Sequence, residues 1–414
     1  MHIKSPAPGI PPRCLKQIFF AGLTLLLFPA GLRAQEPMKI AGPMAATAEP
    51  SGNENFWKQL NKDLSGYYKL LPTYSWTRDA DKAYYAVLQR LRLEYSPQLT
   101  ERLGLNLVYD HELLLHDFKN SEDFSLVKQN NEKNLAFWDA EQTISDTDHV
   151  YERQLLYRAF LRYEFDNSRL IAGKQLIDWG RMRFYSPADL FNQPLPSSIE
   201  PDERVGFDAF YYESFYDGGG WSALFGPEEN SQKTSFGLRL NRKIGTYDTF
   251  LMAAKYQKER VAGFGWDGYV GSAGFRGEFT YTKNGSQNYP RVAIGADYSF
   301  TRKLYALVEY FYNGAAQEDA SEFLSNLKLA QQLLSVRKNL LSFLATYEIT
   351  PLLKAKGAII CDPQGKSAFF NPELRYNVLR NTDVACGAQI FSKSPKGEFS
   401  GYKNLYYAEV KVYF

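Results

Sequence analysis

The sequence predicts an all-β fold, a transmembrane antiparallel up-and-down β-barrel, and three observations lead to this prediction. Apolar and polar residues alternate along most of the chain with the period of two that is typical of strands. Aromatic residues make up 15% of the chain although its mean hydropathy is −0.39, which suits a barrel with aromatic girdles and alternating faces. The sequence also ends on one of these alternating segments, residues 405–414.

The segment 405–414 indicates that the sheet closes on itself. Val410 and Phe414 belong to its apolar side, whereas Glu409 and Lys411 belong to its opposite, charged side. An apolar strand at an open sheet edge would be an aggregation site. Closure into a barrel removes that edge, so this strand is expected to pair on both sides.

Three parts are predicted along the chain. Residues 1–34 have the features of a secretory signal peptide, namely a basic start, a short apolar run at 18–28 and small residues at the end. A retained anchor is the alternative, but the apolar run is short for a membrane span. Residues 35–62 are expected to form a flexible periplasmic segment, and residues 63–414 the barrel.

Within the barrel region, strand-like segments come in pairs joined by tight turns, and longer connections separate the pairs. Outer-membrane barrels have this rhythm, with the short turns on the periplasmic side. Eight hairpins supply sixteen strands, and the first and last strands raise the total to 18, with both termini periplasmic. Sixteen strands is the alternative, if 64–74 or 221–225 forms none. The predicted strands are 64–74, 84–95, 103–112, 154–165, 169–177, 206–216, 221–225, 235–243, 247–257, 261–266, 273–283, 292–300, 303–312, 340–349, 353–360, 369–377, 382–391 and 405–414.

Three connections at the opposite end are long. Residues 116–153 are polar and acidic, and residues 180–205 are rich in proline and aromatic residues. Residues 317–338 have an amphipathic pattern that predicts a short helix packed on neighbouring loops.

Charged residues recur on the side of each strand that lies opposite its apolar residues. A charge facing lipid at mid-depth costs about 2–4 kcal/mol, so these residues are predicted to face a water-filled lumen. Taken together, these charged residues indicate a pore that guides charged solutes. For each single residue the alternative is that it pairs with an opposite charge in the wall and stiffens the barrel. The predicted pore-lining residues are Arg90, Arg92, Arg102, Arg158, Arg162, Arg239, Arg276, Glu278, Arg291, Lys303, Glu309, Lys354, Lys356, Arg375, Glu409 and Lys411.

Strict alternation makes the two faces explicit. It predicts that Val292 and Val410 face lipid and that Arg276 and Lys411 face the lumen, and Leu307 is expected near the membrane. A register shift of one residue would reverse these assignments.

A constriction is predicted at residues 180–205, because an 18-stranded barrel is too wide for its wall side chains to fill. This segment carries Arg181, Arg183 and Asp189 close together. Two cations in a narrow, low-dielectric passage would favour anions there. In the alternative, the loop packs over the rim and its arginines pair with Asp189 or Glu200.

The stretch 172–194, AGKQLIDWGRMRFYSPADLFNQP, resembles a segment of porin-like outer-membrane channels, a group that includes alginate-export-like barrels. Lys174 stands where that group usually has Arg, and Ser186-Pro187 where it has Asn-Pro. Residues 64–69 resemble the opening strand of such barrels. Phe414 resembles the C-terminal signal that they present to the barrel-insertion machinery. The resemblance implies a location in the outer membrane of a Gram-negative bacterium.

Other classes of protein are disfavoured. The net charge of +2 lacks the basic excess that is typical of nucleic-acid binding. His111 and His116 are one residue too far apart for the His-Glu-x-x-His zinc pattern, and no serine has a nucleophile-elbow context. No enzyme activity, metal or cofactor is therefore expected. Cys361 and Cys386 fall on predicted strands two apart, which disfavours a disulfide.

The sequence thus predicts a channel through which polar or charged solutes, including small anions, cross the outer membrane passively. Its expected surroundings are outer-membrane lipid and the insertion machinery. Two alternatives stay open: a barrel that sheathes a partner such as a multihaem cytochrome, and a polysaccharide export channel.

Overall fold

The computed structural model describes residues 62–132, 137, 140–193, 195–228, 234–285, 287–316, 334–392 and 394–414. The predicted signal peptide and residues 35–61 of the predicted flexible segment lie outside this part of the chain. Residues 317–333 of the predicted amphipathic helix lie outside it as well, and residues 334–338 are not helical.

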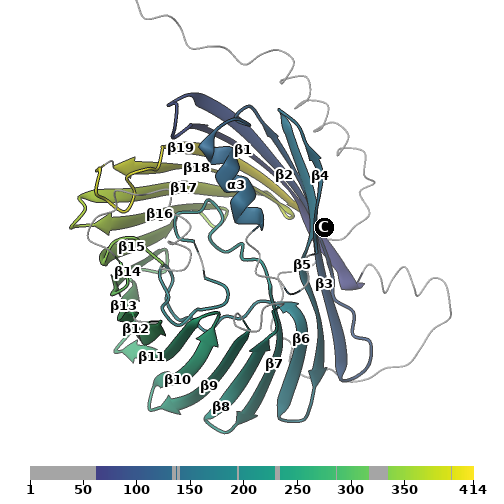
Figure 1. The fold of residues 1–414 in the computed structure, drawn as a ribbon, viewed down its shortest axis with the longest axis vertical. Coiled ribbons are helices and arrows are strands. Elements are labelled where there is room, and N and C mark those ends of the chain that lie inside the picture. Colours follow the sequence, from purple (N-terminus) through teal and green to yellow (C-terminus); the bar gives the residue numbers. More distant parts are fainter. Residues whose placement is uncertain are drawn as a thin grey trace, which may run out of the picture. The chain divides into compact units, whose positions relative to one another are not determined.

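In the described residues, nineteen strands form one antiparallel sheet, and eighteen of them close the barrel in chain order (Figure 1). The sheet closes where β19 pairs with β1, from Tyr67 opposite Tyr413 to Tyr74 opposite Tyr406. The strands are β1 (Leu64–Trp76), β2 (Ala83–Tyr95), β3 (Leu103–His116), β4 (Glu141–Asp146), β5 (Val150–Glu164), β6 (Ser168–Gln175), β7 (Phe207–Tyr216), β8 (Gly219–Gly226), β9 (Ser235–Ile244), β10 (Tyr247–Tyr256), β11 (Glu259–Val270), β12 (Ala273–Asn284), β13 (Gln287–Ser299), β14 (Leu304–Asn313), β15 (Asn339–Glu348), β16 (Leu353–Asp362), β17 (Ser367–Leu379), β18 (Thr382–Ser392) and β19 (Leu405–Tyr413).

The prediction of 18 barrel strands is confirmed, and the alternative of sixteen is wrong. Both doubtful segments form strands, β1 and β8, because each finds partners on both sides. The start of β1 and the end of β19 lie beside the tight turns: Ser96 N–H donates to Asp63 O and Tyr413 N–H to Asn381 O. Cys361 on β16 and Cys386 on β18 are free cysteines.

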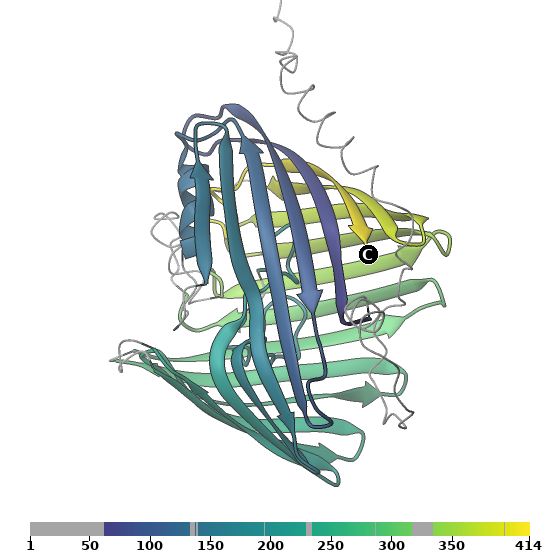
Figure 2. The same cartoon turned by 90° about the vertical axis from the view of Figure 1, so that its right-hand side faces the viewer.

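Two elements inside residues 116–153 were not predicted. Helix α3 (Glu122–Glu132) begins after Ser121, whose Oγ accepts the N–H of Phe124, an N-cap contact. β4 pairs with the part of β5 that extends beyond β6. β2, β3 and β5 make a tall wall that faces the viewer in Figure 2. Within the described chain, no helix has the length and apolar character needed to cross a membrane.

The register places the two faces largely as alternation predicts. Val410 and Phe414 are exposed on the outward face, and Lys411 pairs across the sheet with Lys69 on the inward face. The expectation for Leu307 is wrong, since this residue is 3% exposed and lies inside the barrel. Leu307 precedes an inward-facing glutamate, Glu309, by two residues, and residues two apart on a strand share a face.

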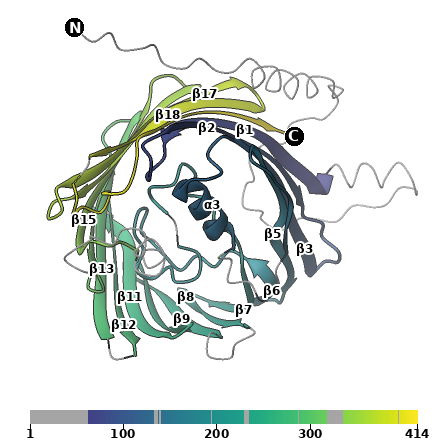
Figure 3. The same cartoon turned by 45° about the horizontal axis from the view of Figure 1, so that its top comes forward.

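The connection between β6 and β7, residues 176–206, folds into the barrel, and we call it the ring loop (Figures 1 and 3). Its apolar side chains form two clusters with the inner wall. Tyr185 packs with Phe311 and Leu340 in one cluster, and Trp179 packs with Phe250 in the other. The sequence predicted charged residues along the inner wall. The inner wall also carries apolar residues, and the ring loop covers them.

Trp179 also explains one glycine of the wall. Trp179 is 1% exposed, and a Cβ on Gly237 of β9 would lie 2.5 Å from its ring. Only glycine leaves room for the indole at this point of the wall. The sequence pattern gave no reason for a glycine in this strand.

Candidate functional site

The ring loop touches the inner wall on most sides of the barrel. Its contacts reach β9 (Arg239 to Trp179 O), β12 (Glu278), β14 (Glu309), β18 (Gln389 to Ser197 O), β1 (Lys69), β2 (Arg90) and β5 (Arg158 to Arg204 O). Figure 1 shows the loop traced inside the circle of strands. The segment thus contacts the inner wall at several strands, and its role as a constriction stays a prediction.

Glu278 holds the first half of the ring loop to β12. Its carboxylate accepts the main-chain N–H groups of Arg181 and Ala188, the latter at 2.9 Å, and the hydroxyl of Ser186 at 2.8 Å. Glu278 is completely buried. These are charge-assisted hydrogen bonds, which are stronger than bonds between neutral groups.

Glu309 does the same on β14. It accepts the N–H of Arg183 at 2.8 Å and the N–H of Phe184 at 2.9 Å, one on each carboxylate oxygen. Both wall carboxylates thus bind the main chain of the loop and leave the guanidinium groups of Arg181 and Arg183 unused in these bonds. The sequence predicted that Glu278 and Glu309 line the pore; in the structure both side chains are buried and bind the ring loop.

Arg181, Arg183 and Asp189 were predicted to lie together, and in the structure their side chains differ in exposure and in partners. The side chain of Arg183 is exposed and that of Arg181 is half-buried. Asp189 is 1% exposed and pairs with Arg204 at 2.8 Å. Burial raises the pKa of Asp189 well above its usual range, and the charge of Asp178 adds to this effect. Asp189 therefore takes its counter-charge from Arg204 and not from Arg181 or Arg183.

The predicted alternative pairing is not found among these described residues either. Asp189 binds Arg204, and Glu200 binds Lys69 and Arg90. The arginines of the first half of the loop therefore do not take their counter-charge from the loop's own acidic residues.

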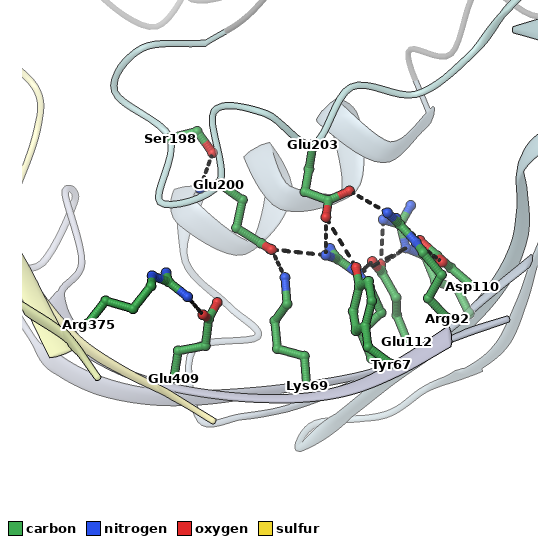
Figure 4. A network of polar contacts seen from close by, with 12 residues as sticks. Tyr67, Lys69, Arg92, Asp110, Glu112, Ser198, Glu200, Glu203, Arg375 and Glu409 are labelled. Atoms are coloured by element: carbon green, nitrogen blue, oxygen red, sulfur yellow. Dashed lines mark hydrogen bonds and ion pairs between the residues drawn. The ribbon is translucent and has the colours of Figure 1, made fainter. Parts of the chain in front are cut away.

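The second half of the ring loop is held by ion pairs (Figure 4). We call Lys69, Arg90 and Arg92, on β1 and β2, the basic cluster. Glu200 contacts Lys69 and lies 3.1 Å from Arg90 Nη1, while Glu203 lies 2.9 Å from Arg92 Nη1 and 3.7 Å from Arg90. Burial disfavours the charged form of Glu203, but Arg92 and Arg90 outweigh it and lower its pKa to about 2.

Behind the basic cluster, the wall forms a ladder of ion pairs. Arg92 makes a two-pronged contact with Asp110, with both bonds at 2.6 Å. Arg90 contacts Glu112 at 2.6 Å, and Glu112 also binds Arg153 at 2.6 Å. This ladder crosses β2, β3 and β5, so its charges neutralise one another within the wall.

The residues predicted to line the pore fall into three groups. Six contact the ring loop: Arg90, Arg92, Arg158, Arg239, Glu278 and Glu309. Eight lie on strands and contact wall partners: Arg162 with Glu164, Arg276 with Asp297, Arg291 with Asn313, Lys354 with Glu348, Lys356 opposite Glu373, Arg375 with Glu409, and Lys411 with the Tyr67 ring. Arg102 and Lys303 lie in tight turns before β3 and β14, not on strands. Many of these residues are paired with another side chain of the wall. This is the alternative that the sequence left open for each single residue.

Lys69 and Glu203 were missed from the sequence, and Glu200 was named only as a possible partner of Arg181 and Arg183. Lys69 shares a strand face with Tyr67, so period-two alternation held a signal for it. Glu200 and Glu203 had none, because their partners are more than a hundred positions away in the chain.

A second loop, residues 394–404 between β18 and β19, packs against the ring loop. Phe399 is 2% exposed and belongs to the same apolar cluster as Tyr185. Tyr402 stacks on Phe391 with 4.8 Å between ring centroids. This loop therefore helps to support the ring loop from the end of the barrel that carries the long connections.

Glu398 fixes the 394–404 loop. Its carboxylate accepts the N–H groups of Val336 at 3.0 Å and Arg337 at 2.8 Å, and its own N–H donates to Asp362 at 3.0 Å. Burial raises the pKa of Glu398 to about 8; the charge of Asp362 adds to the shift, and the N–H donors and Arg337 oppose it.

We expect the packing of the 394–404 loop to weaken as pH rises from about 4.5 to about 8. The packed carboxyl of Glu398 holds its proton more tightly than an exposed one, so the packed state is favoured at low pH and loses this advantage as pH rises. Amide hydrogen exchange of the loop, compared between wild type and Glu398→Gln at each pH, measures this and cancels the intrinsic pH effect on exchange. An equal pH response in both proteins would contradict the assignment to Glu398.

In the portion of the chain that the structure describes, no group of three or more His, Cys, Asp or Glu residues is arranged to hold a metal ion. The site is therefore described by its ion pairs, its apolar clusters and the exposed arginine of the ring loop.

A closed antiparallel barrel of 18 strands is a fold that transmembrane β-barrels adopt. Among solved structures, OccAB1 of Acinetobacter baumannii is similar, with 10% identity, a TM-score of 0.54, and coverage of 85% of this chain and 96% of that chain. OccK5 (OpdH) of Pseudomonas aeruginosa has 11% identity, a TM-score of 0.52, and coverage of 85% and 98%. A triple mutant of the Rhodopseudomonas blastica porin has 9% identity, a TM-score of 0.44, and coverage of 85% and 99%.

At these identities, the likeness to the two Occ structures establishes the fold. It supports the porin-like part of the resemblance seen in the sequence and does not extend to alginate export. No protein-family model matches the sequence, and no curated protein matches it.

Proposed function

We propose that the protein is an outer-membrane channel through which small polar or charged solutes, anions in particular, diffuse passively. The observation that carries this proposal is the ring loop, which is fixed inside the barrel by Glu278 and Glu309 and exposes the side chain of Arg183. A loop held across a wide barrel narrows it, and the charges on that loop then act on every solute that passes. The proposal includes no chemical step.

Preference for anions follows from how the loop is held. Glu278 and Glu309 are wall carboxylates that contact the segment of Arg181 and Arg183, and they do so through main-chain N–H groups rather than through the two guanidinium groups. The wall ladder beside the basic cluster is paired within itself. The positive charge of the two arginines is therefore the local charge most available to a solute, and a low-dielectric passage strengthens its effect.

The test is the reversal potential of purified protein in a planar bilayer with a salt gradient. The double variant Arg181→Glu with Arg183→Glu should shift selectivity toward cations. Arg102→Glu with Lys303→Glu makes the same change of net charge in the tight turns and is the matched control, with a smaller shift expected. No shift in the ring-loop variant, with unchanged conductance, would place the loop outside the ion path.

The alternatives are less well supported. A sheath needs room in the lumen for a partner, whereas this lumen contains the chain's own loop. A polysaccharide export channel needs a long basic track, whereas Arg92 and Arg90 are paired with Asp110 and Glu112. The outer-membrane location and recognition by the insertion machinery are part of the proposal. Phe414, 37% exposed beyond the last strand, is accessible for that recognition.

A further inference from the structure

The two halves of the ring loop are held by different forces. Every residue from 184 to 192 is buried, whereas no residue from 195 to 204 is. We call residues 195–204 the return arm. Its main contacts with the wall are the ion pairs of Glu200 and Glu203 with the basic cluster. Three hydrogen bonds supplement them: Gln389 to Ser197 O, Arg158 to Arg204 O, and the Tyr67 hydroxyl to Glu203. Apolar burial and the hydrogen bonds to Glu278 and Glu309 fix the first half, while ion pairs are the main contacts of the return arm.

The basic cluster has the geometry of an anion site. Arg92 and Arg90 are each oriented by a wall carboxylate, Asp110 and Glu112, and present their remaining N–H groups to the lumen side. Arginine held in this way is suited to planar or tetrahedral anions. In the structure those N–H groups meet the carboxylates of the return arm, and both of these carboxylates lie close to one nitrogen, Arg90 Nη1.

We propose that the return arm is a displaceable plug: Glu200 and Glu203 occupy an anion site formed by the basic cluster, and a soluble anion with two negatively charged groups can take their place. The inference rests on the proposed function and extends it: besides the constriction, the lumen has a second anion site, and the return arm controls access to it. Without the arm, the three cations of the basic cluster face only two wall carboxylates, Asp110 and Glu112, so one positive charge has no wall partner. A solute with two anionic groups close enough to share Arg90 matches the two carboxylates that it replaces.

Hydrogen exchange of the full protein, measured by mass spectrometry, tests whether the arm moves. Glu200→Gln with Glu203→Gln keeps the shape of both side chains and removes their charge, and should raise exchange in residues 195–204 about tenfold. Inorganic pyrophosphate should do the same in wild type, relative to potassium chloride at equal ionic strength. Residues 184–192 serve as the internal control and should not change. Unaltered exchange of the arm with pyrophosphate would overturn the proposal.

Competition tests the site itself. Pyrophosphate should bind about tenfold more tightly to the Glu200→Gln, Glu203→Gln variant, because its internal competitor is weakened. The matched control is Glu348→Gln with Glu373→Gln, two carboxylates paired with wall cations, which should leave binding unchanged. Lys69→Gln should weaken binding. Binding that is insensitive to Lys69→Gln but lost in Arg181→Gln with Arg183→Gln would overturn the inference and move the site to the constriction.

Failure of this inference and failure of the proposed function are distinguishable. Exchange and binding are measured on detergent-solubilised protein and need no transport. A wild-type barrel that conducts no ions would contradict the channel, whereas the response of the return arm to pyrophosphate would stand or fall independently.

Discussion

Replacement of residues 181–203 by a short glycine-serine linker is expected to raise the single-channel conductance severalfold. The wall closes through main-chain pairing around the whole circumference, so it does not depend on the loop. The linker has a short distance to bridge, since Asp178 and Arg204 contact each other at 3.5 Å. Without the loop, the wall side chains of an 18-stranded barrel cannot fill the interior.

Conductance steps in a planar bilayer measure this effect, and the shift of the folded barrel on an unheated gel confirms that the variant is assembled. Thermal stability should fall, because the apolar clusters around Trp179 and Tyr185 lose one side. A folded variant with wild-type conductance would show that the ring loop does not limit the passage.

Glu278→Ala is expected to have the largest effect of any single substitution in the wall. It leaves three buried donors without an acceptor: the N–H groups of Arg181 and Ala188 and the hydroxyl of Ser186. Each such donor costs about 1–3 kcal/mol, so the first half of the loop should leave the wall. Conductance should rise and anion selectivity should fall, because Arg181 is no longer held at the constriction.

Glu348→Ala is the matched control, since it removes a carboxylate on strand β15 of the same wall, and the partner of that carboxylate, Lys354, is half exposed. An exposed pair of this kind contributes about 0–1 kcal/mol, so conductance and selectivity should stay near wild type. Equal effects of the two substitutions would mean that Glu278 acts through general barrel stability rather than through the loop.

Local sequence patterns were sufficient to predict the strands of the barrel wall. Each of the 18 barrel strands was predicted from alternation and turn residues, and Val410 and Lys411 took the faces that alternation assigned. The missed elements, α3 and β4, lie in a polar segment without such periodicity. Leu307 shows that residue type alone does not predict the direction of a side chain. An apolar residue on a barrel strand can face inward where a loop covers it.

The candidate site was predictable only in part. An inward path for the ring loop was predicted from its prolines, its charged residues and the width of the barrel. The choice of partners did not, because Asp189 binds Arg204 while Glu200 reaches Lys69, 131 residues away. Wall carboxylates such as Glu278 have the same sequence signal whether they meet water, a cation or a main-chain N–H group.

The sequence by itself determined the barrel, its strand number and the register of its faces, because a strand's period of two is a local property that each segment carries alone. Only the tertiary structure decided how the lumen is occupied. The ring loop meets strands from β1 to β18, and its contacts depend on which distant side chains the closed barrel brings within hydrogen-bonding distance. Burial then decides which charges pair and which stay exposed, as with buried Asp189 and exposed Arg183.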